Sequence, residues 1–143
     1  MSEDQVSVYQ YRGKCSCGEV QLALSLPDML PAYTPRACDC DYCTARGIQY
    51  LSHPAGQLRV QSAQPLHEDH QGSGQACFYS CNQCGDLVAV GCEIGGRTLG
   101  TINATLLDDA ENLPEALVVS PKQLAPEEKL ARWGQVWMPL TFG

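Results

Sequence analysis

Cysteine is the residue type whose spacing in this sequence could support chemistry. The chain has nine cysteines in 143 residues, and seven of them fall into three tight groups. The groups are Cys15 and Cys17, then Cys38, Cys40 and Cys43, and finally Cys81 and Cys84. Two thiolates one or two residues apart can face the same metal ion, because a short turn directs both sulfur atoms inward and backbone N–H groups hydrogen-bond to them. The spacing therefore indicates metal binding, and the odd cysteine count argues against a closed set of disulfides.

The first and third groups predict a closed, structural zinc site. Each is a two-cysteine turn followed by glycine, with Gly18 after Cys17 and Gly85 after Cys84. Glycine readily adopts the left-handed backbone conformation that closes such a turn. If the two turns meet across the fold, their four thiolates form a tetrahedron around one Zn²⁺, and the binding energy is partly folding energy.

The middle group predicts a second zinc ion per chain, with a different role. Cys38, Cys40 and Cys43 are three ligands within six residues, and no glycine follows them. Three protein ligands leave one position of Zn²⁺ open to water, a thiol or a carbonyl oxygen, so the ion could act as a Lewis acid. The alternative is a second structural site completed by Cys77, Cys92 or a histidine.

The other cysteines and histidines are expected to take no part in the chemistry. Cys77 and Cys92 lie in apolar segments, where a buried free cysteine is common. His67 and His70 lie in a polar, glycine-rich stretch, residues 67–74, where we expect a loop with solvated imidazoles.

Hydrophobic periodicity predicts the strands that position these groups. Val20, Leu22, Leu24 and Leu26 alternate with polar or small residues, which is typical of a half-buried strand over residues 19–26. An extended segment at 6–11 precedes it, so the first cysteine pair is expected at the tip of a hairpin. Further extended segments are predicted at 48–52, 57–61, 75–80, 87–92 and 98–106.

Helix is predicted to be scarce. A turn or two can follow Cys40, and residues 126–133 begin with proline and two glutamates, which suit a helix start. Trp133 and Trp137 are expected to anchor the C-terminal segment to the core. The sequence thus predicts one mainly β domain spanning residues 1–143, with zinc-binding turns, or knuckles, and little helix.

Composition and charge limit the classes of molecule that the chain is expected to bind. The chain has 16 acidic and 9 basic residues, a net charge of −7 and a pI near 4.7, which argues against a basic surface that binds nucleic acid or anionic lipid. No apolar run approaches the roughly 20 residues of a membrane span. The N-terminal residues show no secretory or transit pattern, so we expect a cytoplasmic protein whose partner is a small molecule or a protein.

The sequence resembles the glutathione-dependent formaldehyde-activating enzyme family, which is also named for its centromere-protein-V members. The segments that match are GKCSCGEVQLAL, ACDCDYCTARG and FYSCNQCGDLVAV, with weaker matches in ATLLDD and ARWGQVWMPL. The resemblance runs from Gly13 to near the C-terminus. Three cysteine groups in this order, each with fitting neighbours, make it specific.

The resemblance implies a β-tent fold, built from sheets that carry two zinc sites. It implies a structural zinc held by Cys15, Cys17, Cys81 and Cys84, and a catalytic zinc held by Cys38, Cys40 and Cys43. It also implies carbon–sulfur lyase activity, with the adduct of formaldehyde and glutathione, S-hydroxymethylglutathione, as the type substrate.

Two positions depart from the family pattern. Asp41 stands where serine is usual, and the arginine common after the third cysteine of the triplet is displaced to Arg46. Our hypothesis is that the triplet zinc polarises the sulfur or hydroxyl of a small thiol adduct, with Arg36 or Arg46 receiving a substrate carboxylate and Asp41 moving a proton. The alternatives are a non-enzymatic, zinc-stabilised protein-binding module, and a thiol redox protein with Cys77 or Cys92 as nucleophile.

Overall fold

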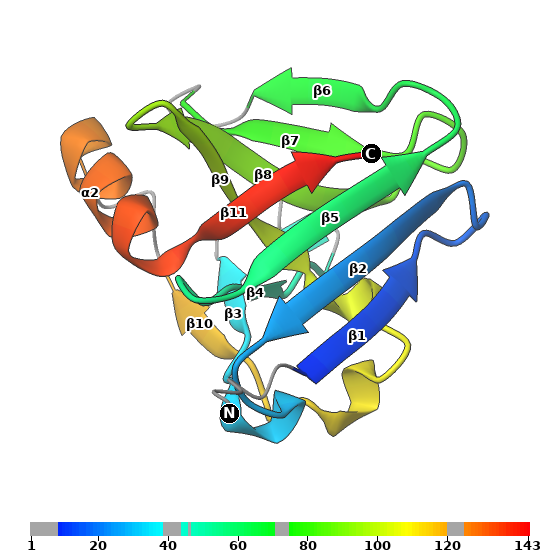
Figure 1. Ribbon diagram of the computed structural model, residues 1–143, viewed down its shortest axis with the longest axis horizontal. Helices are drawn as coiled ribbons and strands as arrows, with labels where there is room; N and C mark the ends of the chain where they lie inside the picture. The colour runs from blue at the N-terminus through cyan, green and yellow to red at the C-terminus, as the bar shows by residue number, and fades with distance from the viewer. Residues whose placement is uncertain (1–8, 39–43, 46, 71–74, 120–124) are drawn as a thin grey trace, which may run out of the picture.

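The chain has a mainly β fold with little helix, which confirms the predicted fold class (Figure 1). The computed structural model describes residues 9–38, 44–45, 47–70, 75–119 and 125–143, and for Cys38 and Pro126 it describes the backbone alone. The strands are β1 (Tyr9–Lys14), β2 (Val20–Leu26), β3 (Arg36–Cys38), β4 (Tyr50–Leu51), β5 (Gln57–Ser62), β6 (His67–His70), β7 (Cys77–Ser80), β8 (Leu87–Ile94), β9 (Arg97–Asn103), β10 (Leu117–Val119) and β11 (Met138–Phe142). The helical elements are the 3₁₀ turns η1 (Leu30–Ala32), η2 (Ala104–Leu106) and η3 (Ala110–Asn112) and the α-helix α2 (Pro126–Val136).

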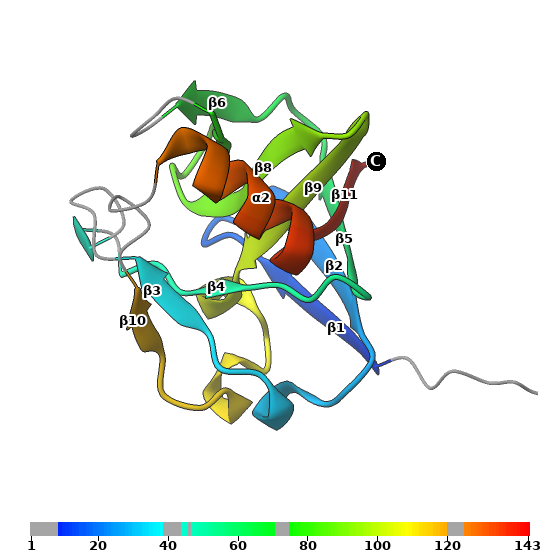
Figure 2. The same ribbon diagram turned by 90° about the vertical axis from the view of Figure 1, so that its left-hand side faces the viewer.

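Strand β9 is the branch point of the sheet. One of its edges pairs antiparallel with β8, and the sheet continues through β7 to β6. Its other edge is shared, because β11 pairs with it at Leu99 and Gly100 while β4 pairs with it at Ile102 and Asn103. From there β11 leads through β5 and β2 to β1, and β4 leads through β3 to β10. The two arms diverge, with β1, β2 and β5 on one side of the molecule and β3 and β10 on the other (Figure 2).

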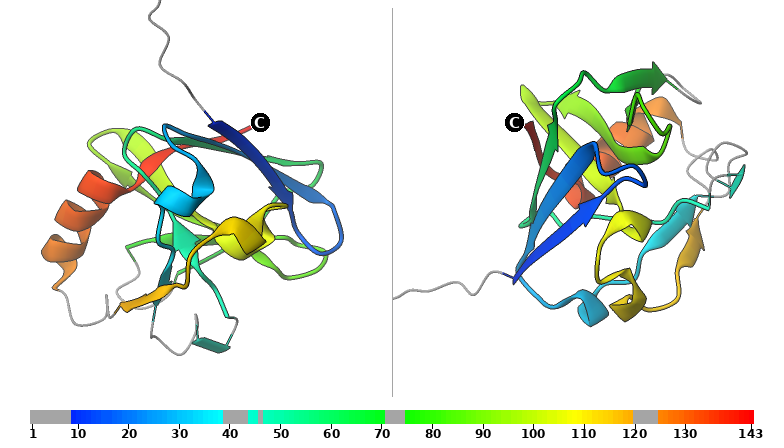
Figure 3. Two further views of the ribbon diagram at one scale, coloured as in Figure 1. Left: turned by 90° about the horizontal axis from the view of Figure 1, so that it is seen from below. Right: turned by 90° about the vertical axis from the view of Figure 1, so that its right-hand side faces the viewer.

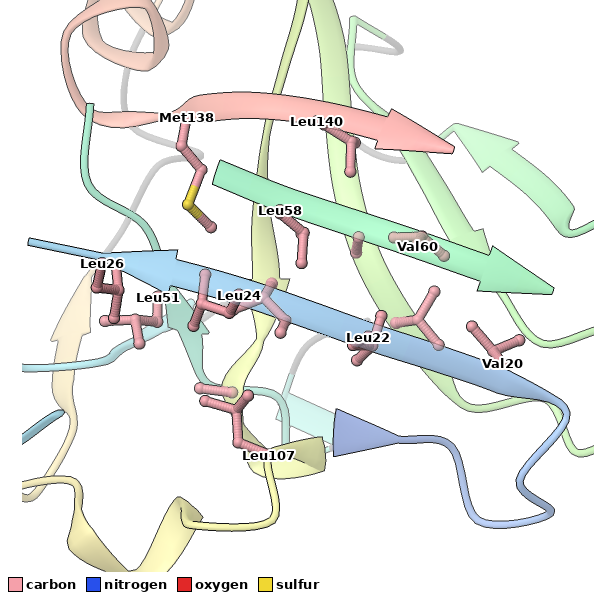
Figure 4. Close-up of a cluster of buried hydrophobic side chains, with 14 of the residues drawn as sticks. Val20, Leu22, Leu24, Leu26, Leu51, Leu58, Val60, Leu107, Met138 and Leu140 are labelled. Carbon is pink, nitrogen blue, oxygen red and sulfur yellow. The ribbon is translucent and has the colours of Figure 1, made fainter. Parts of the chain in front are cut away.

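The main hydrophobic core lies against the inner face of β2, β5 and β11. The alternation predicted for β2 is confirmed, since Val20, Leu22, Leu24 and Leu26 are each at most 2% exposed. Figure 4 shows their side chains together with those of Leu58, Val60, Met138 and Leu140, and with Leu51 and Leu107 approaching from other elements. Burial of this apolar surface contributes about 25 cal/mol to the free energy of folding for each Å² removed from water. The inward-facing side chains of β2 therefore stabilise the β1–β2 hairpin.

Two glycines allow β11 to pack closely against the β8–β9 pair. Gly100 of β9 pairs with Gly91 of β8, and Leu140 of β11 lies over both. A Cβ at either glycine would lie 2.8 Å from Leu140 Cδ2, and a Cβ at Gly100 would also lie 2.6 Å from the Val90 carbonyl oxygen. Any larger residue there would push β11 away from the β8–β9 pair.

Helix α2 packs through a pair of indoles. Trp133 and Trp137 are stacked, with ring centroids 4.5 Å apart and planes 6° from parallel, and they join a second apolar cluster with Ile48, Val90 and Leu99. Their predicted role as anchors is confirmed, because Trp137 is buried at the end of the helix. No helix in the described part of the chain is long and apolar enough to cross a membrane.

The 3₁₀ turns η1, η2 and η3 lie at the end of the molecule opposite β6 (Figure 3). Asn103 ties this end to the sheet. Its side-chain amide donates to the Leu87 carbonyl oxygen at 2.8 Å, and its Oδ1 accepts a hydrogen bond from the Thr105 amide at 3.3 Å, which starts η2.

The structure differs from the sequence prediction at several elements. The loop predicted for residues 67–74 is wrong for its first half, because His67–His70 pairs with β7 as an edge strand. Backbone pairing with a neighbour can hold an edge strand, so such a strand needs no apolar pattern. Strands β3, β10 and β11 were not predicted, since two of them have three residues and the third contains Pro139. Residues 41–43 and 46 of the turn predicted after Cys40 lie outside the described residues, while residues 44–45 are described and helical. The extended residues 6–8 also lie outside the described residues.

Candidate metal centre

The first cysteine turn closes the β1–β2 hairpin. The Cys15 amide donates to the Val20 carbonyl oxygen at 3.1 Å, and the Gly18 amide donates to the Cys15 carbonyl oxygen at 3.0 Å. Gly18 has φ = 82°, in the left-handed region that favours glycine. The turn therefore confirms the predicted hairpin, with Cys15 and Cys17 at its tip.

The second cysteine turn connects β7 to β8 in a similar way. The Cys81 amide donates to the Asp86 carbonyl oxygen at 2.9 Å, and the Gly85 amide donates to the Cys81 carbonyl oxygen at 2.9 Å. Gly85 also has φ = 82°. Both glycines thus have the conformation that their places after the cysteines predicted.

The two turns bring four sulfur atoms together from positions far apart in the sequence. The Sγ atoms of Cys15, Cys17, Cys81 and Cys84 all lie within 4.8 Å of one another. Cys17 Sγ lies 3.6 Å from both Cys15 Sγ and Cys81 Sγ. With Zn–S bonds of about 2.3 Å, the sulfur atoms of a tetrahedral site are about 3.8 Å apart, so these separations fit a metal ion. A disulfide requires about 2.05 Å between sulfur atoms.

Backbone amides are directed at the buried sulfur atoms. Cys81 Sγ accepts hydrogen bonds from the amides of Gln83 at 3.4 Å and Cys84 at 3.5 Å, and Cys15 Sγ accepts one from the Val20 amide at 3.3 Å. These bonds stabilise negative charge on sulfur. Cys15 and Cys81 are each 1% exposed and belong to the main core, whereas Cys17 is exposed and Cys84 is partly buried, so the cluster lies at the edge of the packed interior.

The thiols of Cys15 and Cys17 differ in acidity. Burial raises the pKa of Cys15, but hydrogen bonds from the Val20 amide and the neighbouring thiols outweigh burial and lower the pKa to about 7. The Glu19 amide lowers the pKa of Cys17, but desolvation and the contacts with Cys15 and the other thiols outweigh it and raise the pKa to about 12. A soft divalent cation is the partner that allows all four to be thiolates together.

Asp86 links the two turns directly. Its Oδ2 accepts hydrogen bonds from the Ser16 amide at 2.8 Å and from the Ser16 hydroxyl at 2.5 Å. Ser16 lies between the cysteines of the first turn, and Asp86 directly follows the glycine of the second. Sequence reasoning missed this link, because 70 residues separate the partners and neither has a distinctive spacing.

The cysteine triplet is described only in part. Cys38 is the last residue of β3 and pairs in parallel register with Val119 of β10. Cys40, Asp41, Cys43 and Arg46 lie outside the described residues.

Arg36 is the described charged residue nearest to the triplet in the sequence. It begins β3, where it lies opposite Tyr50 of β4, and it is partly buried. Desolvation and the positive charge of Arg132 on α2 lower the pKa of its guanidinium. The fold therefore brings a second arginine, which the sequence did not single out, within electrostatic reach of Arg36.

The isolated cysteines and histidines lie away from this cluster. Cys77 is buried, and its thiol donates a hydrogen bond to Glu68 Oε1 at 3.7 Å. Cys92 is partly buried and packs against the second apolar cluster, which contains Trp133 and Trp137. Burial raises the pKa of both thiols. His67 and His70 are exposed on β6, and neither joins a metal-binding group among the described residues.

The family model for the glutathione-dependent formaldehyde-activating enzyme matches residues 10–128. That range contains all three cysteine groups and both turns of the four-cysteine cluster. The chain belongs to this family, which confirms the resemblance seen in the sequence. No protein of curated function matches the chain.

A solved structure supports the fold independently. The chain is similar to a crystal structure of a Rhodobacter sphaeroides protein from structural genomics, with a TM-score of 0.53 and 20% sequence identity. The likeness covers 92% of this chain and 99% of that one. At this identity it shows a shared fold.

Proposed function

We propose that this chain is a zinc-dependent enzyme of the carbon–sulfur lyase type, which acts on a small thiol adduct such as S-hydroxymethylglutathione. The observation that carries the proposal is the family match over residues 10–128 together with four sulfur atoms at metal-binding separations. A single domain spanning residues 1–143 would hold two zinc ions, one structural and one catalytic.

The structural zinc is assigned to Cys15, Cys17, Cys81 and Cys84. Four thiolates fill a tetrahedral shell and leave no position for a substrate, so this ion has a folding role. It would join the tip of the β1–β2 hairpin to the tip of the β7–β8 hairpin. One hairpin is reached from β9 through β11 and the other through β8, and the ion would fix the two hairpins relative to each other.

The catalytic zinc is assigned to Cys38, Cys40 and Cys43. When bound there, Zn²⁺ supplies a Lewis acid with an open position that suits sulfur ligands. In this proposal Arg36 receives a substrate carboxylate through paired N–H donors, and the nearby charge of Arg132 adds to the attraction.

The decisive experiment measures zinc per chain and its rate of transfer to a chelator, with and without glutathione. We expect two ions, one held tightly and one labile with a rate that glutathione changes. Cys40→Ala should remove the labile ion and turnover of S-hydroxymethylglutathione while the far-ultraviolet circular dichroism stays unchanged. Cys92→Ser is the matched control and should keep both ions.

Two equally inert ions, or one ion, would instead support the zinc-stabilised protein-binding module. The thiol redox function has less support, because burial raises the pKa of Cys77 and Cys92 and a reactive cysteine needs a lowered one.

A further inference from the structure

The outer face of β1, β2, β5 and β11 contains a hollow that is rich in positive charge. Its volume is about 590 Å³, and its twelve lining residues include Arg12 and Arg59 but no aspartate or glutamate. The chain as a whole has 16 acidic and 9 basic residues, so the hollow has the opposite charge to the rest of the molecule. No described element covers this face, which points toward the viewer in Figure 1 and to the right in Figure 2.

Strand register places the two arginines on one row. Arg12 lies opposite Ala23, and Ala23 lies opposite Arg59, so the arginines are two strands apart. Adjacent strands are about 4.8 Å apart, which puts the two Cα atoms about 10 Å from each other. Leu22 and Leu24 point into the core, so Ala23 between them points outward, and its methyl group leaves space between the arginines.

Uncharged hydrogen-bonding groups surround the pair. The polar residues that also line the hollow are Gln10, Ser25, Gln57 and Thr141. The guanidinium of Arg59 packs against the backbone at Gly143, where a Cβ would lie 2.6 Å from Nη2. This packing limits the rotamers of Arg59, so less side-chain entropy remains to be lost when an anion binds.

We propose that this hollow binds a small linear dicarboxylate, with one carboxylate on Arg12, the other on Arg59, and the aliphatic spacer over Ala23. Arginine accepts a carboxylate in paired, charge-assisted hydrogen bonds. The methylene stems of the two arginines and the Ala23 methyl group supply an apolar floor for the spacer.

Calorimetry on the zinc-loaded protein at low ionic strength tests the proposal with three probes. Suberate spans the row, succinate has the same two charges on a shorter spacer, and octanoate has the long chain with one charge. We expect suberate to bind about tenfold more tightly than either of the others. Added salt should weaken its binding, since both arginines are exposed.

Substitutions then locate the site. Arg12→Gln and Arg59→Gln should each reduce the affinity for suberate to that for octanoate. Ala23→Val should also weaken binding, because the larger side chain fills the space between the arginines. Valine is favoured in strands, so the fold should tolerate this substitution. Arg97→Gln, an exposed arginine at the start of β9, is the control and should change nothing.

Equal affinities for suberate and octanoate, or suberate binding that survives Arg12→Gln, would overturn the proposal. Zinc content measured on the same samples should stay constant in every variant. The result is therefore independent of the proposed zinc enzyme, and either hypothesis can fail alone.

Discussion

The two cysteine turns reach the same geometry with different spacing. In both, the first cysteine pairs through its amide with the carbonyl oxygen of the residue five positions later, which is Val20 in one turn and Asp86 in the other. The first turn has one residue between its cysteines, and its glycine amide closes back over four residues. The second has two residues between its cysteines, and its glycine amide closes over five.

The extra residue between the cysteines accompanies a difference in the hydrogen bonds that the first sulfur atom of each turn accepts. Cys81 Sγ accepts two amide hydrogen bonds from within its own turn, from Gln83 and Cys84, whereas Cys15 Sγ accepts one from Val20. In each turn the first cysteine is buried, while Cys17 is exposed. Both turns share the hydrogen bond from the first cysteine and a glycine in the left-handed conformation. The comparison teaches that these two features set the positions of the sulfur atoms, while the number of residues between the cysteines can vary.

The largest effect should come from removing one sulfur from either turn. Cys15→Ser and Cys81→Ser should each lose the tightly held zinc ion and lower the melting temperature by about 10 °C or more, because metal binding supplies folding energy. Zinc analysis and thermal unfolding followed by circular dichroism measure both effects. Cys92→Ser removes a partly buried thiol outside the cluster and should keep the ion. A tightly held ion that survives either cluster substitution would show that the turns do not share one site.

Cutting the link between the turns should have a smaller effect. Asp86→Ala removes the carboxylate that accepts both Ser16 hydrogen bonds, and we expect a loss of about 1–2 kcal/mol in stability and faster zinc transfer to a chelator. Asp109→Ala is the matched control, since the Asp109 side chain makes no capping hydrogen bond. If both variants lose zinc at the same rate, Asp86 has no part in holding the turns together.

The glycines test whether the two turns are equivalent. Gly18→Ala and Gly85→Ala should each cost about 1 kcal/mol, because both residues have φ = 82° and nothing lies within 4 Å of an added Cβ. Gly134→Ala, inside α2 and with only Ile94 Cγ2 nearby at 3.7 Å, should instead stabilise the protein by about 0.5–1 kcal/mol. Denaturant titration gives all three values. Unequal costs at Gly18 and Gly85 would mean that only one turn depends on its glycine.

The smallest effect is expected at the isolated thiols. Burial keeps the pKa of Cys77 and Cys92 above the ordinary value of 9.0, so thiolate is scarce at pH 8 and becomes common only as the pH rises above that value. In the zinc-loaded protein, iodoacetamide at pH 8 should therefore modify both more slowly than it modifies glutathione. Mass spectrometry of tryptic peptides gives the rates. Faster modification of Cys92 would revive the redox hypothesis.

Much of the fold could be predicted because local sequence patterns indicate many of its strands and its helix. Alternating leucines predicted β2, and proline with two glutamates predicted α2, which starts at Pro126 as expected and runs three residues further, to Val136. Strand β6 was predicted as a loop, because an edge strand of polar residues has no apolar period. Strand β11 was missed because it contains Pro139, and because its pairing partner changes from β9 to β5 along its length, which no local pattern indicates.

The sequence by itself determined which residues could bind metal, since thiol chemistry, close spacing and a following glycine are local properties. It also determined the family, through three cysteine groups in order. Only the tertiary structure decided that Cys15 and Cys17 meet Cys81 and Cys84, because 64 residues separate the two turns and sheet pairing brings them together. The same pairing set the Arg12–Ala23–Arg59 row, whose members come from three strands and share no pattern along the chain.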